Sequence, residues 1–191
     1  MKISFKTISA KVTKTDLLVL LSPEGRAPKL PSGVTIPKSV ETSFSGKIRE
    51  TRFADTIDGP AERVLLIGLG KGKSFDLETV RRAAAIAAQK AQKTYAASVT
   101  FWVDLKLDKS AEDFGQALGE GLVMGAHRLV NFKRSPKKCS LKKLIIQSSK
   151  EVSRGAKTGV IVGEGNTFAR RLQDTPANKM RPRDMVAEAR K

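Results

Sequence analysis

The sequence predicts an α/β domain in which helices flank a layered, largely parallel or mixed sheet, with a long helix near the C-terminus. First, apolar runs typical of strands, at 63–69, 98–105 and 140–148, alternate with stretches of helical periodicity. Second, the continuous apolar run at 16–22 indicates a strand that is buried on both faces, as in parallel sheets. Third, a long helical stretch covers about 153–172.

The N-terminal part favours shorter strands. Residues 2–10 read as a strand, and the alternating residues at 46–55 predict a partly exposed one. The segment 23–39 holds four prolines, which predicts a loop. We expect the early, shorter strands to be antiparallel and to lie at an edge of the sheet.

The clearest unit is a strand, a glycine turn and a helix. The strand at 63–69 runs into the turn at 68–73, and Ser74 or Asp76 can cap the following helix. The apolar residues at helical spacing predict the buried face of this helix: Leu77, Val80, Ala84, Ala87, Ala91 and Tyr95.

Two further helices follow strands. Ser110 and Asp113 fit a capping box for the first, in which Gly121 and Gly125 allow close packing. Its predicted apolar face consists of Phe114, Leu118, Leu122 and Leu129. The predicted apolar residues of the last long helix are Val160, Ile161, Phe168 and Leu172.

Composition excludes several kinds of site. The 191 residues include one cysteine, Cys139, and one histidine, His127, so an internal disulfide or a typical zinc site cannot form within this chain. An active site carried by this chain alone would have to use carboxylates, lysines or hydroxyl groups. No apolar stretch approaches signal-peptide or membrane-helix length, so we expect a cytoplasmic protein without membrane contact.

The formal net charge of +17 favours polyanions as partners. Residues 128–157 hold ten basic residues against one acid. The candidate polyanion contacts are Arg128, Lys133, Arg134, Lys137, Lys138, Lys142 and Lys143. Because Phe132 is the one aromatic residue in the run, sequence-specific reading is disfavoured and non-specific, salt-sensitive DNA or RNA binding is the alternative function. A solvated loop is the simpler interpretation of the same residues.

The glycine turn is a candidate phosphate site. Gly68, Gly70 and Gly72 stand between a strand and a helix, where a phosphate can meet backbone N–H groups. The spacing matches neither the dinucleotide-binding pattern nor a P-loop, so a structural turn is favoured. A macro-like ADP-ribose-binding domain using Gly68–Gly72 is the second alternative function.

The C-terminal stretch "FARRLQDTPANKMRP" closely resembles the segment that joins the two domains of leucyl aminopeptidases, the cytosol aminopeptidase family of metallo-exopeptidases. The matching residues are Asn166, Ala169, Arg170, Leu172, Thr175, Pro176, Ala177, Asn178, Met180 and Pro182. Upstream, "VLLIGLGKGKSFDLETVRRAAAIAA" and "GLVMGAHRLVNFKRSPKK" are similar to the family too. Leu129 stands where a tyrosine is common, and Arg181 where a Thr or Ser cap is usual.

The resemblance implies a division of the chain. Residues 1–150 would form the N-terminal, non-catalytic α/β domain, which in the family is similar to macro domains. Residues 151–174 would form the linker helix, and 175–191 a stub of the catalytic domain. The domain-junction motif consists of Thr175, Pro176, Ala177 and Asn178. We expect the proline to fix the turn and the asparagine side chain to hydrogen-bond to backbone.

The resemblance also implies a function. The parent enzyme would remove N-terminal residues from peptides with two divalent metals, zinc or manganese, held by a catalytic domain that continues beyond Lys191. This chain would carry no catalytic residue and no metal ligand, and would be inactive alone. Its expected partners are its own catalytic domain and further copies in a homo-hexamer, where it would serve assembly or active-site access.

Overall fold

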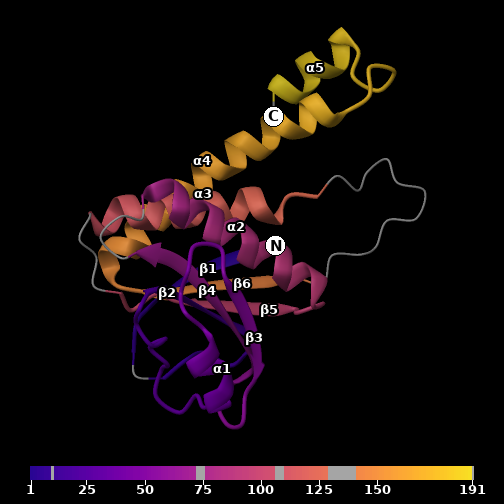
Figure 1. The fold of residues 1–191 in the computed structure, drawn as a ribbon. Helices are drawn as coiled ribbons and strands as arrows, with labels where there is room; N and C mark the ends of the chain where they lie inside the picture. Colours follow the sequence, from indigo (N-terminus) through magenta and orange to yellow (C-terminus); the bar gives the residue numbers. More distant parts are fainter. Residues whose placement is uncertain (10, 72–75, 106–109, 129–140, 191) are drawn as a thin grey trace.

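The computed structural model describes residues 1–9, 11–71, 76–105, 110–128 and 141–190. These residues form one six-stranded sheet in the order β1-β6-β5-β2-β4-β3, with helices on both faces (Figure 1). The strands are β1 (Lys2–Thr7), β2 (Thr15–Glu24), β3 (Thr51–Asp55), β4 (Ala61–Lys71), β5 (Ser98–Trp102) and β6 (Lys143–Ser148). The helices are α1 (Lys38–Ser43), α2 (Leu77–Lys93), α3 (Ala111–Ala126), α4 (Lys150–Asp174) and α5 (Pro182–Ala189). The predicted α/β class with a long C-terminal helix is confirmed.

The sheet is mixed but mostly parallel. β1, β6, β5, β2 and β4 are parallel neighbours, and β3 alone among the described strands pairs antiparallel, with β4. The predicted antiparallel edge is therefore correct for β3. It is wrong for β1, which lies at the other edge but runs parallel to β6. β2 lies in the centre between two parallel neighbours, so the prediction of a buried strand typical of parallel sheets is confirmed. The continuous apolar run of β2 suits a position covered on both faces.

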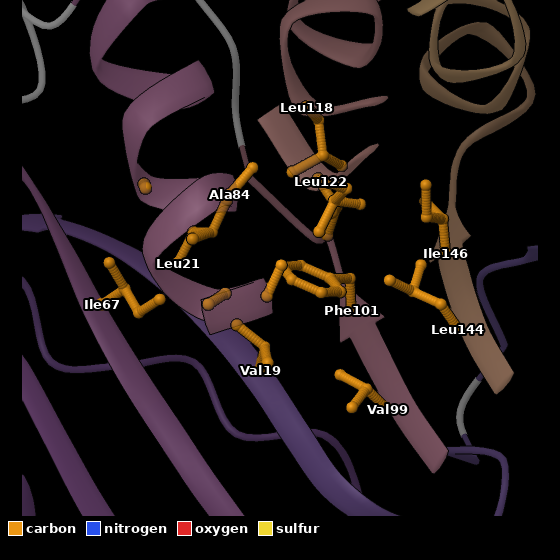
Figure 2. Close-up of a cluster of buried hydrophobic side chains, with 14 of the residues drawn as sticks. Val19, Leu21, Ile67, Ala84, Val99, Phe101, Leu118, Leu122, Leu144 and Ile146 are labelled. Carbon is orange, nitrogen blue, oxygen red and sulfur yellow. The ribbon is translucent and has the colours of Figure 1, made fainter. Parts of the chain in front are cut away.

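The core lies on both sides of the sheet. Helices α2, α3 and α4 cover one face, and α1 with the segment around it lies on the other (Figure 1). Figure 2 shows the helix side, where Phe101 lies among Val19, Leu118 and Leu144, all of them buried. The second cluster, on the opposite face, includes Leu18, Leu20, Ile36, Phe44, Leu66 and Trp102.

The helix starts follow the predicted caps. The Asp76 carboxylate accepts from the Thr79 N–H at 2.7 Å, and the Ser110 hydroxyl accepts from the Asp113 N–H at 3.4 Å. The prediction for Tyr95 is wrong, because α2 ends before it. Tyr95 is 63% exposed and has a φ of 59° in the turn that leaves the helix. The predicted positions of Ser74 and Leu129 lie outside the described residues.

Small residues bring the three helices close together. Cβ atoms at Gly121 and Gly125 of α3 would overlap the backbone of Arg81 and Ala85 of α2, so the predicted close packing is confirmed. A second glycine pair on α3, Gly115 and Gly119, faces α4. The glycines of α4 that face α3 in return are Gly155, Gly159 and Gly163.

The apolar side chains predicted to form the buried face of α4 do not lie in the core. Ile161 is 70% exposed and Phe168 is 38% exposed, while Val160 and Leu172 are half-buried. α4 packs against α3 through its own glycines and Ala156, because glycines of α3 lie at the opposing positions. Glycines spaced four residues apart are the sequence signal for this packing. On α3, one such pair faces α2 and the other faces α4.

Element bounds differ modestly from the prediction. β5 and β6 are shorter than predicted, and the strand predicted at 46–55 begins at Thr51. α4 starts three residues before the predicted position, because the Ser149 hydroxyl caps it by accepting from the Val152 N–H at 3.3 Å. Such end shifts reflect local capping rather than a different fold.

Candidate functional site at the domain junction

The C-terminal part of the chain projects from the body of the domain. We call residues 164–190 the distal arm: they comprise α4 beyond its last glycine contact with α3, the junction turn, and α5. Figure 1 shows α4 extending away from the sheet and α5 folding back beside its end. The arm holds the motif on which the resemblance depends.

The junction turn is fixed by its own backbone. The Thr175 hydroxyl donates to the Arg171 carbonyl at 2.6 Å, which closes the end of α4. The Pro176 carbonyl then accepts from the Lys179 N–H at 2.8 Å and the Met180 N–H at 3.1 Å. The proline ring fixes φ where the chain leaves the helix. The motif therefore forms a tight connection between two helices.

The other two motif residues face solvent. Ala177 and Asn178 are exposed. Within the part of the chain that the structure describes, the Asn178 side chain makes no hydrogen bond. The predicted hydrogen bond between the Asn178 side chain and backbone therefore stays a prediction. Testing it requires any polypeptide that contacts this surface.

α5 starts at Pro182 although Arg181 replaces the usual Thr or Ser. The Asp184 carboxylate accepts from the Arg181 N–H at 3.0 Å and from its guanidinium at 2.9 Å. Hydrogen bonds from the Arg181 side chain and backbone lower the pKa of Asp184. The acid at the third helical position thus supplies the capping contact.

An ion pair sets α5 against α4. The Arg171 guanidinium donates to the Glu188 carboxylate at 2.8 Å, and the same guanidinium lies 5.3 Å from the centre of the Phe168 ring. Sequence reasoning missed this pair, which joins positions 17 residues apart across the turn. The two helices and the turn enclose a shallow hollow of about 340 Å³.

The arm exposes apolar side chains on both of its helices. Those exposed on α4 and α5 are Ile161, Val162, Phe168, Met185 and Val186. Ile161 and Val162 lie on α4 just before the arm. Gly165 lies among them with nothing within 4 Å of a Cβ placed on it, unlike the glycines that face α3. Contact with further polypeptide would remove these side chains from water.

The basic residues are only partly described. Arg128, Lys142 and Lys143 flank the segment 129–140, and the other candidate polyanion contacts lie outside the described residues. Arg128 lines a hollow of about 450 Å³ together with Lys93 and Tyr95. The Lys142 and Lys143 N–H groups donate to the Ala97 carbonyl at 2.9 and 3.0 Å, while their side chains are exposed. The structure leaves polyanion binding as a prediction.

The glycine turn uses its N–H groups internally. The Gly68 N–H donates to the Glu50 carbonyl and the Gly70 N–H to the Gly46 carbonyl, each at 2.9 Å. A Cβ at Gly68 would overlap the Lys47 carbonyl, and Gly70 has a φ of 75°. Both glycines lie within β4 rather than in the predicted turn, and they serve the packing of the segment before β3. Gly72 lies outside the described residues.

Among the described residues, no group of three or more His, Cys, Asp or Glu side chains is placed to hold a metal ion. None of the described helices combines the length and apolar character needed to cross a bilayer.

The sequence matches known proteins over most of its length. The family model for the cytosol aminopeptidase family, N-terminal domain, matches residues 21–136. A probable cytosol aminopeptidase of Roseiflexus castenholzii is 31% identical over 187 residues, which cover 93% of this chain and 38% of that protein. One from Acaryochloris marina is 39% identical over 99 residues, which cover 50% of this chain and 20% of that protein.

Solved structures share the fold. A tomato leucine aminopeptidase mutant matches with a TM-score of 0.79 and 22% identity, covering 100% of this chain and 41% of that one. The bottromycin maturation enzyme BotP in complex with Mn matches with a TM-score of 0.74 and 24% identity, covering 92% of this chain and 35% of that one.

The comparisons also show which part of its relatives this chain matches. It spans well under half of the length of these relatives, and the matched region is the N-terminal domain rather than the whole protein. The family's members are aminopeptidases, which are hydrolases. The chain belongs to the cytosol aminopeptidase family, of which it carries the N-terminal domain.

Proposed function

We propose that this chain is the non-catalytic N-terminal part of a leucyl aminopeptidase that removes N-terminal residues from peptides with two divalent metals. The observation that carries the proposal is the family match over residues 21–136, in a chain that covers 38% of its R. castenholzii relative. In this proposal the metals, zinc or manganese, are held by the catalytic domain. One structural neighbour is a maturation enzyme in complex with Mn, which supports a metal-dependent parent.

We propose a division of the chain into residues 1–150, 151–174 and 175–191. The body is the non-catalytic domain, α4 is the linker helix, and the residues after Asp174 begin the catalytic domain. The exposed apolar side chains of α4 and α5 support this division, because contact with further polypeptide would bury them, and that burial is favourable. The domain would thereby serve assembly, as a hexamer in the cytoplasm, or control access to the active site.

Activity of the chain alone tests the division of labour. We expect no hydrolysis when the 191-residue chain is incubated with Leu-p-nitroanilide and manganese. A full-length relative, such as the R. castenholzii protein, provides the positive control under the same conditions. Sustained turnover by the 191-residue chain that stops on addition of a chelator would refute the proposal.

A chimera tests the junction itself. This chain would replace the matching N-terminal part of the R. castenholzii relative, and we expect the chimera to hydrolyse Leu-p-nitroanilide. Ile161→Gln with Phe168→Gln should lower its activity or its assembly, because both side chains would lie in the proposed interface. Ile57→Gln is the matched control, since Ile57 is 68% exposed but lies away from the arm. Equal effects of the two variants would contradict the placement of the interface.

The two alternative functions gain no support from the comparisons. The ADP-ribose alternative also loses two of its expected donors, because the Gly68 and Gly70 N–H groups are already bonded within the protein. Calorimetry with ADP-ribose would test it directly, and we expect no heat of binding.

A further inference from the structure

The outermost strand at one end of the sheet has a side without a neighbouring strand. β3 stands last in the strand order, and β4 is the one described strand that pairs with it (Figure 1). Just before β3, the Glu50 carbonyl accepts from the Gly68 N–H at 2.9 Å. Just after β3, the Thr56 N–H donates to the Glu62 carbonyl at 3.1 Å. These two hydrogen bonds fix which backbone groups of β3 face β4, because bonded and non-bonded pairs alternate in an antiparallel ladder.

The alternation leaves three residues of β3 with backbone groups that face outward. Arg52 and Ala54 hydrogen-bond to β4, whereas the N–H and C=O groups of Thr51, Phe53 and Asp55 point away from it. Within the part of the chain that the structure describes, no hydrogen bond to these outward groups is present. Each outward residue offers one donor and one acceptor, so this edge can pair with an added extended segment.

Apolar side chains are exposed beside the free edge, on the side of the sheet that α2 covers. Phe53 is 38% exposed in the middle of β3, and Ile48, before the strand, is 57% exposed. Ile48 lines a small hollow of about 20 Å³ together with Thr79 and Ala83 of α2. The Lys90 ammonium of α2 lies 5.7 Å from the centre of the Phe53 ring. A segment added to the edge would therefore meet apolar surface as well as free backbone groups.

Positive charge is in surplus around this edge. The nearby acids, Glu50, Asp55 and Glu78, are each paired with an arginine. Arg49, in the turn before β3, and Lys90 have no carboxylate partner among the described residues. Acidic side chains on an incoming segment would complement these two cations.

We propose that the β3 edge and the adjoining flank of α2 bind an extended, acidic segment of a partner polypeptide, which adds to the sheet as a further strand. The segment's backbone pairs with the outward groups of β3, one of its apolar side chains packs on Phe53, and its carboxylates pair with Arg49 and Lys90. A second copy of this chain is disfavoured as the occupant, because each copy carries a net charge of +17. The inference does not depend on the proposed aminopeptidase role.

Binding of designed peptides to the 191-residue chain tests the site. The first probe is a short, fluorescein-labelled peptide in which valine alternates with glutamate. The second probe has the same sequence but is N-methylated throughout, so it keeps its charges and loses the N–H groups that would pair with β3. By fluorescence anisotropy we expect the first probe to bind at least about ten-fold more tightly, since it alone can donate to the edge. Equal affinities would mean attraction by overall charge alone and would overturn the proposal.

Two substitutions at one position separate the backbone edge from the rest of the fold. Phe53→Pro removes an N–H that points away from β4, and an edge strand tolerates proline at such a position. It should weaken binding of the first probe at least about ten-fold, whereas Phe53→Val keeps the N–H and should stay within about three-fold of the wild type. Urea denaturation establishes that both variants are folded. Equal affinities of the two folded variants would contradict pairing along this edge.

A charge comparison keeps the proposal testable even if the proline variant does not fold. Arg49→Gln with Lys90→Gln should weaken binding of the first probe about five-fold more than Lys2→Gln with Lys143→Gln, which removes equal charge at the opposite edge of the sheet. Equal losses in the two double variants would place the peptide elsewhere and overturn the site. Sedimentation of the chain alone checks the other occupant, because a dimer that Phe53→Val weakens would assign the edge to a second copy and refute the proposed partner.

Discussion

At the scale of single residues, one carboxylate links the starts of two neighbouring strands of the sheet. Asp16, at the beginning of β2, accepts from the Ala97 N–H at 2.7 Å and from the Ser98 N–H at 3.1 Å. It also accepts from the Ser98 hydroxyl at 2.8 Å. One side chain thus ties the starts of two neighbouring parallel strands, β2 and β5, together.

Replacing this carboxylate should destabilise the fold in a pH-dependent way. Partial burial raises the pKa of Asp16, but hydrogen bonds from Ser98 and Ala97 outweigh it and lower the pKa below its ordinary value. Stabilisation is therefore present above the unfolded-state value and lost as pH falls through the folded-state value. We expect Asp16→Asn to lower the free energy of unfolding by about 1 to 2 kcal/mol at neutral pH, measured by urea denaturation.

The same measurement at acidic pH provides the check. Once Asp16 is protonated it resembles asparagine, so the difference between wild type and variant should disappear below the folded-state pKa. Asp58→Asn, at an exposed position, should change the free energy of unfolding by less than about 0.5 kcal/mol at neutral pH. A difference for Asp16→Asn that persists unchanged at acidic pH would contradict the role given to the charge.

At the scale of elements, sequence patterns predicted strands, caps and most of the buried faces of α2 and α3, but not the contact face of α4. The apolar runs of β2 and β4 and the caps Asp76 and Ser110 are local features, and local features can be read from neighbouring residues. The parallel pairing of β1 with β6 is not local, because it joins residues about 140 positions apart. The apolar side chains of α4 predict the wrong face, because its contact with α3 depends on glycines.

The glycines of α4 should separate into two classes. Gly159 faces α3, where an added Cβ would overlap the Gln116 carbonyl, whereas Gly165 has open space. We expect Gly159→Ala to lower the free energy of unfolding by about 1 to 3 kcal/mol through overpacking. Gly165→Ala should raise it by up to about 1 kcal/mol, because alanine favours the helix. Urea denaturation of both variants measures the contrast, and gains of equal size at the two positions would show that the helices do not pack as described.

At the scale of the whole molecule, the sequence predicted the family but not the contacts of the arm. The junction motif indicated the family that the comparisons then showed. The arm contacts could not be predicted, because Arg171–Glu188 and His127–Asp174 depend on how α4 leaves the body and how α5 folds back. Charge is the remaining whole-molecule property that the fold does not explain.

The net charge of +17 should make the chain bind polyanions in a salt-dependent way. If the basic run forms a contact surface, neutralising it must weaken binding more than neutralising equal charge elsewhere. One glutamine variant changes Lys133, Arg134, Lys137 and Lys138. The control variant changes four exposed lysines, Lys2, Lys14, Lys38 and Lys47. Both lose four positive charges, so their long-range fields fall equally while their local contacts differ.

Fluorescence anisotropy with duplex DNA over a series of salt concentrations distinguishes local contact from overall charge. Each phosphate contact contributes about 0.9 to the slope of log affinity against log salt, so the variant in the run should lose up to about 3 to 4 from that slope. The control variant should bind more weakly with a nearly unchanged slope, since it removes attraction at a distance but few ion contacts. Equal slopes for the two variants would assign the binding to the overall charge of the molecule, and an absence of affinity at low salt would remove the basic run as a polyanion surface altogether.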